Sequence, residues 1–358
     1  MAVYDKRYEK LRLYMKENGL DGVYVTSEEN YLYLSGYHNP DGFMVVTEDR
    51  SFVFADFRYF EAAKEKAFPC CTVLEQVGGC LREQLAESGV KTLGFEDRHL
   101  TVSDHKKLSE IGGELGITLR GIGDTLTEIR AVKEPGEIEL IVKAQRIAER
   151  ALDNLIKVIN YDMTEIEVAA ELEYFMKKNG SEVPSFDTIA VSGKASSVPH
   201  GVPRYVKLER GFLTLDFGAT VAGYHSDMTR TLVIGKADEE IKKVYDTVLA
   251  AQTAAHEFIR AGVTGDEADK VARDVITEAG YGECFGHSLG HGVGLQIHEL
   301  PNLSPKIIGR KLVPGNLITN EPGIYLEGKY GCRIEDMVWI SDDGPVNLTE
   351  FTHDMIEI

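Results

Sequence analysis

Four acidic side chains stand within or beside apolar, strand-like segments in the second half of this sequence. Asp216 belongs to the apolar segment 212–217, and Asp227 follows a glycine-bounded turn in the same stretch, so we expect the two on neighbouring strands. Glu321 ends another apolar segment, and Glu335 precedes a third. Aspartate is depleted in strands, and a carboxylate on an apolar strand must be paired or bind a cation. An ordinary turn or salt bridge would explain Asp227 alone, but less readily Asp216.

A histidine between two glycines supplies a candidate metal ligand of another type. His291 lies in Gly290-His-Gly292, where the glycines leave little side-chain surface for packing, so a ligand role is favoured over a core position. Four carboxylates brought together would repel each other and raise one another's pKa values, at a cost of several kcal/mol. Two divalent cations remove that repulsion. A carboxylate-rich set of ligands with a single imidazole suits Mn²⁺, with Co²⁺ or Zn²⁺ as alternatives.

The elements that must position these residues follow a weak internal repeat. We expect a helix over Glu137–Ile159, then Thr164-x-x-Glu167 and a second helix, and the same order returns with Glu239–Ala261 and Thr264-x-x-Glu267. Each Thr-x-x-Glu is typical of a capping box, and the glycine that ends each second helix suits a left-handed helix end. These glycines are Gly180 and Gly280. Glycine-rich strands with acids and histidines follow both pairs, which favours a duplication over two ordinary capped helices and favours a site between the halves.

The first third of the chain predicts a separate, small α/β domain. Its expected elements are a helix over Tyr4–Glu17 and strands over Val23–Thr26, Phe43–Thr47 and Ser51–Ala55. A charged, proline-containing stretch over 124–135 then leads into the first long helix. We therefore predict two domains, residues 1–128 and residues 129–358, as a chain of this length suggests.

The composition excludes several classes of partner. The chain of 358 residues carries 39 Lys plus Arg and 58 Asp plus Glu, a formal net charge of −19, which would repel nucleic acid phosphates and anionic lipid. Its beginning has no apolar core of signal-peptide length, and no segment approaches the ~20 apolar residues of a membrane-spanning helix. The five cysteines form no C-x-x-C pair, as expected of reduced thiols. We expect a cytoplasmic protein that binds small molecules or peptides, with neither nucleic acid nor membrane as a partner.

Together these motifs resemble those of the pita-bread metallopeptidases, the family of aminopeptidase P, prolidase, methionine aminopeptidase and the metal-free creatinase. The resemblance covers essentially the whole chain, and Gly-Tyr-His-Asn near residue 36 and Asp56-Phe-Arg-Tyr59 resemble the amino-terminal domain of the proline-specific branch. It implies that five residues hold two metal ions, with Asp227 and Glu335 bridging. The implied ligands are Asp216, Asp227, His291, Glu321 and Glu335. The motifs Pro199-His200 and Ile297-His298-Glu299 imply two further site histidines that are not ligands.

The fold class implied by the resemblance is α/β, with a small amino-terminal domain before a pseudo-twofold pita-bread catalytic domain. The implied activity is hydrolysis of the bond between an amino-terminal residue and proline in peptides (Xaa-Pro aminopeptidase), with Xaa-Pro dipeptidase (prolidase) as the alternative, in a homodimer. Glu321 is expected to accept a proton, and His298 or His200 to donate a hydrogen bond to the oxyanion or the scissile nitrogen. Arg333 is expected to orient the carboxylates.

One position separates the two activities. Prolidases of this family resemble one another in placing an arginine four residues after the histidine matched by His298, where it can bind the free carboxylate of proline. Here that position is Asn302, which carries no charge. The sequence therefore favours longer peptides as substrates, although Arg204 or Arg310 could supply a charge in the fold.

Two other classes of function are weaker interpretations. Gly286-His-Ser-Leu-Gly290 matches the nucleophile elbow of serine hydrolases at Ser288, but the elbow needs a helix after the serine, and the glycine-rich sequence up to Gly294 is poor helix sequence. A non-enzymatic peptide-binding relative would be expected to lack metal ligands, and all five are present here. His287 is expected to be structural.

Overall fold

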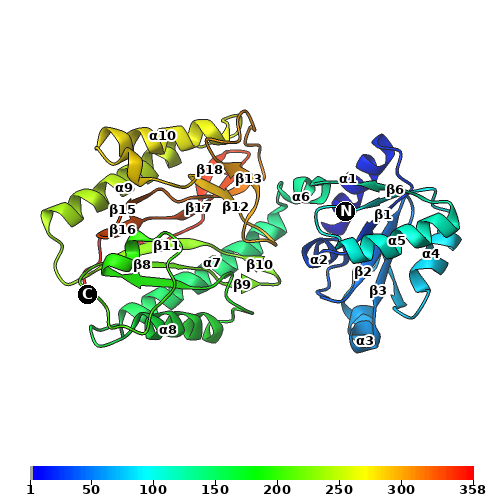
Figure 1. Cartoon of the computed structure of the whole chain (residues 1–358), viewed down its shortest axis with the longest axis horizontal. Helices are drawn as coiled ribbons and strands as arrows, with labels where there is room; N and C mark the ends of the chain where they lie inside the picture. The colour runs from blue at the N-terminus through cyan, green and yellow to red at the C-terminus, as the bar shows by residue number, and fades with distance from the viewer. Residues whose placement is uncertain (1–2) are drawn as a thin grey trace. The chain divides into compact units, whose positions relative to one another are not determined.

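The computed structural model describes residues 3–358, which divide into two compact units between Arg130 and Ala131 (Figure 1). Among these residues no helix is long and apolar enough to cross a membrane. Each unit has its own sheets and its own buried apolar cluster.

A six-stranded mixed sheet forms the centre of the first unit, with the strand order β4-β3-β2-β1-β5-β6. Its elements are α1 (Val3–Glu17), β1 (Gly22–Val25), α2 (Glu28–Ser35), β2 (Phe43–Thr47), β3 (Ser51–Ala55), α3 (Phe57–Lys66), β4 (Cys71–Glu75), α4 (Cys80–Ser88), β5 (Thr92–Phe95), α5 (Val102–Leu115), β6 (Thr118–Gly121) and α6 (Thr125–Arg130). The predicted helix and the first three predicted strands are confirmed to within one residue at each end. Leu85 of α4 and Leu108 of α5 pack on strand residues such as Phe54, so these helices cover one face of the sheet.

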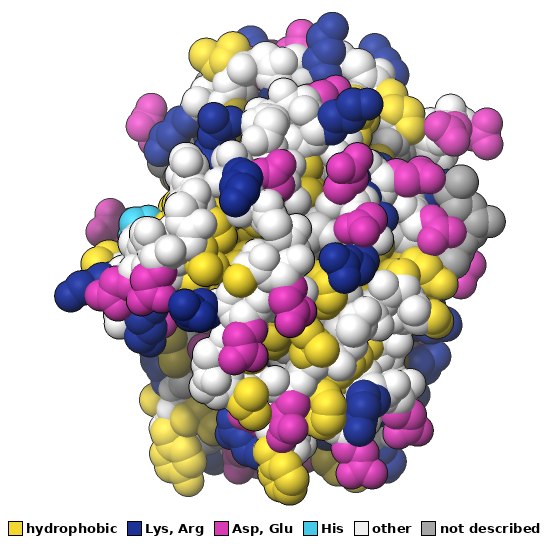
Figure 2. Space-filling view, turned by 90° about the vertical axis from the view of Figure 1, so that its right-hand side faces the viewer, with side chains coloured by type: hydrophobic (Ala, Val, Ile, Leu, Met, Phe, Trp, Pro, Cys, Tyr) yellow, Lys and Arg dark blue, Asp and Glu magenta, His cyan; other side chains and the backbone are white. Residues whose placement is uncertain are grey.

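One face of this unit carries mixed charge. Figure 2 shows acidic and basic side chains interspersed there, with hydrophobic side chains in small groups between them. The negative net charge of the chain therefore does not gather into one field on the face shown.

The second unit contains a three-stranded and a five-stranded sheet, each covered by a pair of helices, and two small two-stranded sheets. Its elements are α7 (Pro135–Ile156), α8 (Glu165–Lys178), β7 (Ile189–Ser192), η1 (Gly193–Ser197), β8 (Gly211–Phe217), β9 (Thr220–Val221), β10 (Tyr224–His225), β11 (Met228–Ile234), α9 (Glu239–Phe258), α10 (Gly265–Glu278), η2 (Gly282–Cys284), β12 (Gly290–Gly292), β13 (Glu299–Leu303), β14 (Leu317–Asn320), β15 (Gly323–Leu326), β16 (Tyr330–Arg333), β17 (Asp336–Ser341) and β18 (Gly344–Asn347). The two larger sheets have the orders β11-β8-β7 and β13-β12-β14-β17-β18, and the two-stranded sheets pair β9 with β10 and β15 with β16. In Figure 1 the helix pairs α7/α8 and α9/α10 lie on the outside and the sheets lie between them.

The expected repeat is visible in the way both second helices begin and end. Thr164 and Thr264 each accept a hydrogen bond from the amide three residues later, and the glutamate there bonds back, so both capping boxes are confirmed. Such caps typically contribute about 1 kcal/mol each. Gly180 and Gly280 follow the helices with φ of 108° and 90°, a region that favours glycine. Isolated bridges pair Thr164 with Lys207 and Thr264 with Lys311, so the two halves repeat beyond the helices.

The long first helix of each pair is shorter than predicted at its carboxyl end. Helix α7 ends at Ile156 and α9 at Phe258, three residues before the expected Ile159 and Ala261. Hydrophobic periodicity continues past the end of a helix wherever the following turn is still buried, as it is at Ile159 and Ile259, so the pattern overestimates helix length.

Candidate metal centre and its pocket

The first half of the second unit contributes two of the predicted acids. Asp216 lies on β8, and Asp227 directly precedes β11. These strands are antiparallel neighbours with Thr229 opposite Asp216, which brings both aspartates to the same end of the strand pair. Asp227 is thus beside its strand rather than on it, because the short hairpin β9–β10 fills the connection in which we expected a simple turn.

The second half contributes the other three predicted ligands. His291 is the central residue of β12, Glu321 directly follows β14, and Glu335 directly precedes β17. Because β14 pairs with both β12 and β17, the three side chains lie on adjacent strands of one sheet. The candidate centre is therefore assembled from both halves.

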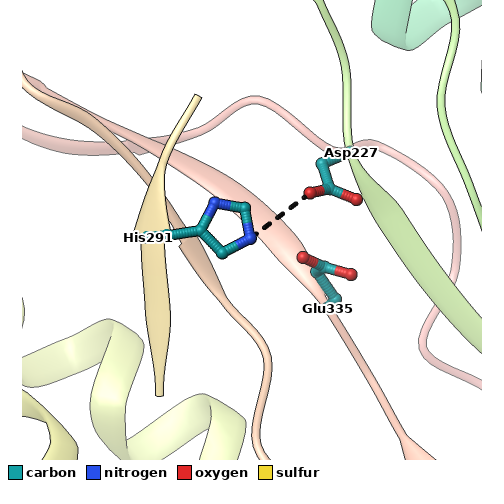
Figure 3. Close-up of side chains that lie close together, drawn as sticks. All are labelled: Asp227, His291 and Glu335. Atoms are coloured by element: carbon teal, nitrogen blue, oxygen red, sulfur yellow. Dashed lines mark ion pairs between the residues drawn. The ribbon is translucent and has the colours of Figure 1, made fainter. Parts of the chain in front are cut away.

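The side chains of Asp227, His291 and Glu335 point toward one another (Figure 3). Each offers a ligand atom, and these atoms all lie within 4.8 Å of one another. His291 Nε2 lies 3.6 Å from Asp227 Oδ2 and 3.3 Å from Glu321 Oε1. His291 Nδ1 lies 3.1 Å from the carbonyl oxygen of Gly292, which can only accept, so Nδ1 carries the proton and Nε2 turns a lone pair toward the carboxylates. Lone pairs facing each other call for a cation between them.

The pKa values of these residues also indicate that the cluster binds a cation. Burial raises the pKa of Glu321 to about 8, with a further contribution from Asp216. Burial and the neighbouring acids also raise the pKa values of Asp227 and Glu335 well above the ordinary carboxyl range, and burial lowers the pKa of His291 to about 3. Asp216 Oδ1 is buried without a hydrogen-bond partner among the described residues. Acids that repel each other, an orphaned oxygen and a neutral imidazole together fit divalent cations.

Hydrogen bonds from neighbouring side chains fix the orientation of these acids. Thr229 Oγ1 donates to Glu335 Oε2 at 2.7 Å, and Thr319 Oγ1 donates to Glu321 Oε1 at 3.1 Å. Arg333, which is 2% exposed, donates through Nη2 to Asp216 Oδ2 at 2.6 Å. The structure thus brings Arg333 against one predicted ligand and orients the carboxylates through their own hydrogen bonds.

A cavity of about 700 Å³ opens over the centre, a size that suits a small peptide. All the predicted site residues line it, namely His200, Asp216, Asp227, His291, His298, Glu321, Arg333 and Glu335. The rings of His291 and His298 have centroids 4.2 Å apart, and burial lowers the pKa of His298, which keeps it neutral near pH 7. Phe186, Ile189, Val202 and Ile297 give the pocket apolar walls.

The sequence interpretation missed Tyr325, and it gave His287 only a structural role. The Tyr325 hydroxyl accepts a hydrogen bond from Arg333 Nη1 at 2.6 Å and lies 3.0 Å from His287 Nε2. His287 Nδ1 faces the carbonyl oxygen of Ser288, so Nε2 is the acceptor, and burial lowers the pKa of His287 to about 4. Both residues stand in motifs that the sequence singled out, but only the pairing of β15 with β16 brings Tyr325 to Arg333.

Ser288 lacks the surroundings of a serine nucleophile. Its hydroxyl donates to Ser304 Oγ at 2.9 Å, and strand β12 follows it where an elbow would need a helix. Ser288 lines the pocket as a neutral hydroxyl.

Comparisons with known proteins agree with this geometry. Residues 139–342 match the family model "Metallopeptidase family M24", and residues 7–132 match "Creatinase/Prolidase N-terminal domain". The chain is 38% identical to a Xaa-Pro dipeptidase of Pyrococcus furiosus over 98% of this chain and 99% of that protein. It therefore belongs to metallopeptidase family M24 and is an enzyme of the pita-bread fold, and the family implies divalent metal ions.

Two solved structures show the same fold at similar identity. A Xaa-Pro dipeptidase from Bacillus anthracis superposes with a TM-score of 0.94 at 37% identity, covering 99% of this chain and 100% of that chain. An X-Pro aminopeptidase from Thermotoga maritima gives a TM-score of 0.91 at 38% identity, covering 98% and 100%. A structure named as a dipeptidase and one named as an aminopeptidase are thus about equally similar to this chain.

Proposed function

We propose that the protein hydrolyses the peptide bond between an amino-terminal residue and proline, as an Xaa-Pro aminopeptidase. The observation that carries this proposal is the cluster of Asp227, His291 and Glu335 within a peptide-sized pocket that also contains His200 and His298. Two ions would be held by these three ligands together with Asp216 and Glu321. When bound, they would supply Lewis-acid polarisation of the scissile carbonyl and a lower pKa for the attacking water.

The chain's own residues have distinct roles in this proposal. Glu321 accepts a proton at its carboxylate, which Thr319 orients. His298 and His200 each carry a ring N–H, which can donate to the developing oxyanion or to the scissile nitrogen. Arg333 holds Asp216 in place through their ion pair. The apolar side chains of Phe186, Ile189 and Val202 line the pocket and offer contacts to a proline ring.

The charges that line the pocket favour peptides longer than a dipeptide. A dipeptide would present the free carboxylate of proline, which needs a cation. Arg333 is the only Arg or Lys among the described residues that line the pocket, and it is bound to Asp216. Asn302 lines the pocket without a charge, and Arg204 is engaged by Glu165. The second candidate, Xaa-Pro dipeptidase, rests on the names of relatives such as that from P. furiosus. Binding of Mn²⁺, a homodimer and a cytoplasmic location stay predictions.

Hydrolysis by metal-stripped protein reloaded with Mn²⁺, Co²⁺ or Zn²⁺ tests the proposal. We expect kcat/KM for an Xaa-Pro-Xaa tripeptide to exceed that for the matching Xaa-Pro dipeptide. Asn302→Arg should narrow the gap by about tenfold to hundredfold, the value of one charge-assisted contact, whereas the uncharged control Asn302→Gln should not. A tenfold preference of the wild type for the dipeptide would favour the dipeptidase, and no cleavage of either peptide with any ion would overturn both.

A further inference from the structure

One wall of the pocket is a short loop, residues 199–203, that carries His200. Its first end is fixed because Arg333 Nη1 reaches the carbonyl oxygen of Pro199 at 3.4 Å and Gly201 N donates to Val198 O. Toward its second end Val202 is 77% exposed, and Pro203 has no amide hydrogen to donate. This end of the wall therefore depends on what holds the residue that follows, Arg204.

Arg204 is held by a carboxylate that lies behind the wall. Glu165, the first residue of α8, is fully buried. Its Oε2 accepts from Arg204 N at 2.9 Å and from Arg204 Nε at 2.8 Å, and its Oε1 accepts from Arg204 Nη2 at 2.7 Å. Ser192 N and Ser192 Oγ also donate to Oε1, at 2.7 and 2.9 Å. Five hydrogen bonds to one buried carboxylate fix both the backbone and the side chain of Arg204.

The charge of Glu165 is stabilised in this position. Burial opposes its ionisation, but the hydrogen bonds from Arg204 and Ser192 outweigh burial and lower its pKa. The pair is thus ionised at neutral pH and charge-assisted, the strong class of hydrogen bond. Backbone bonds from Glu165 N to Val206 O and from Leu208 N to Met163 O extend the anchor along the chain after Arg204.

The other half of the unit uses the same chemistry for its own histidine segment. Asp269 is fully buried in α10 and is paired with Arg273. Asp269 Oδ1 accepts from Leu289 N at 2.9 Å, and Arg273 donates to the carbonyl oxygens of Phe285 and His287 at 2.7 and 2.8 Å. In each half, a buried acid and an arginine that do not line the pocket therefore hold a histidine-bearing segment that does.

The position of the acid differs between the halves for a steric reason. Gly265 begins α10 as Glu165 begins α8, but a Cβ at Gly265 would lie 2.4 Å from the carbonyl oxygen of Asn302. No side chain fits there, so the acid of the second half stands one helical turn later, at Asp269. The two halves thus place a buried acid at different helix positions but use it in the same way, to hold a histidine-bearing segment. This indicates that holding the segment matters, and not the inheritance of one particular residue.

From these contacts we infer that Glu165 and Arg204 are positioning residues, which hold His200 and its wall at the place the reaction requires although neither lines the pocket. The inference rests on the proposed function, because it assigns the effect to His200. Since misplacing a reacting group by about 1 Å can cost about hundredfold in rate, loosening this loop should affect kcat/KM without affecting metal binding.

The experiment compares Glu165→Gln, Arg204→Gln and Arg204→Lys in the metal-loaded, full-length protein. The first two should lose about tenfold to hundredfold in kcat/KM for an Xaa-Pro-Xaa peptide, and Arg204→Lys should recover part of that loss. Metal content and melting temperature show whether the fold persists. The matched control is Lys207→Gln, three residues after Arg204, whose ion pair with Asp162 is exposed, and it should change kcat/KM by less than about twofold.

A double-mutant cycle separates positioning from general stabilisation. In a His200→Ala background, Arg204→Gln should have almost no further effect on kcat/KM, because the group that it positions is absent. Effects that multiply independently would overturn the inference. Hydrogen exchange supplies a readout without activity: amides of residues 200–202 and 204–206 should exchange faster in Arg204→Gln and Glu165→Gln, but not in Lys207→Gln. Unchanged exchange would also overturn the inference, whereas a wild type inactive on Xaa-Pro peptides would count against the proposed function alone.

Discussion

At the scale of single residues, the site is defined by groups that are unfavourable without a cation. Asp227 and Glu335 have raised pKa values because burial and neighbouring acids disfavour their charge, and Asp216 Oδ1 has no donor among the described residues. His298, by contrast, lines the same pocket without belonging to the close cluster of ligand atoms. The two kinds of residue should therefore respond differently to substitution.

The first prediction compares Glu335→Gln with His298→Ala. The amide of glutamine supplies no negative charge, so Glu335→Gln should lose more than about hundredfold in metal affinity and lose activity with it. His298→Ala should keep its metal but lose about 10²–10³-fold in kcat, the typical value of one donor to a developing oxyanion. Elemental analysis after dialysis and steady-state kinetics measure the two effects. Near-normal turnover of His298→Ala would remove His298 from the mechanism.

A second prediction concerns Ser288, for which the metallopeptidase and serine hydrolase readings disagree. The Ser288 hydroxyl donates to Ser304, not to a histidine. Ser288→Ala should therefore keep at least about a third of the activity, as expected for the loss of one neutral hydrogen bond near the pocket. A chelator should abolish activity, and added Mn²⁺ should restore it. Loss of activity in Ser288→Ala together with indifference to the chelator would reverse the assignment.

At the scale of elements, the strand ends that carry the acids are tied to the carboxyl-terminal segment. Arg230 on β11, 2% exposed, donates to the carbonyl oxygen of Glu335 at 2.7 Å and to Asp336 Oδ1 at 2.8 Å. It also donates to the carbonyl oxygen of Phe351 at 2.8 Å. Asp336 is fully buried and accepts further from Gln252, Asn347 and His353. One arginine thus joins the three-stranded sheet, the five-stranded sheet and the carboxyl-terminal segment.

The third prediction tests this junction. Arg230→Met leaves the buried charge of Asp336 without its cation, and breaking such a pair typically costs about 3–5 kcal/mol. Chemical denaturation that follows the second unit should show this loss. Lys242→Met is the matched control, because the ion pair of Lys242 with Glu239 is exposed, and it should cost less than about 1 kcal/mol. Similar stabilities of the two variants would contradict the importance assigned to the junction.

Local signals in the sequence predict some elements better than others. The capping boxes at Thr164 and Thr264 are predictable because each is a contact between residues three apart in the chain. Strand β4 escapes prediction because its residues are only half-buried or exposed, and its adjacent Val73 and Leu74 break a strict alternation of apolar and polar side chains. The types of the candidate ligands are also predictable, since an acid on an apolar strand is unusual. The contact of Tyr325 with Arg333 is not, because it depends on the register of β15 against β16.

At the scale of the whole molecule, neither half of the second unit contains a complete centre. Asp216 and Asp227 come from one half, whereas His291, Glu321 and Glu335 come from the other. The repulsion among these acids therefore acts between the halves and opposes their packing unless protons or cations compensate it. The sequence shows the acids but not the repulsion between them, because that repulsion arises only when tertiary packing buries the acids together.

The last prediction follows from that opposition and concerns protein stripped of metal. Glu321 has a pKa of about 8 in the fold against about 4.5 when unfolded, so between these pH values the folded state binds more protons than the unfolded state. Stability is then fully present below pH ~4.5 and is lost as pH rises toward ~8, at about 1.4 kcal/mol per pH unit for such a group. The raised pKa values of Asp227 and Glu335 act in the same direction. Cations replace these protons, so the melting temperature of the second unit should fall from pH 5 to pH 8 much more steeply with chelator than with Mn²⁺. In the stripped protein Glu321→Gln should flatten that slope, and parallel profiles with and without metal would contradict the prediction.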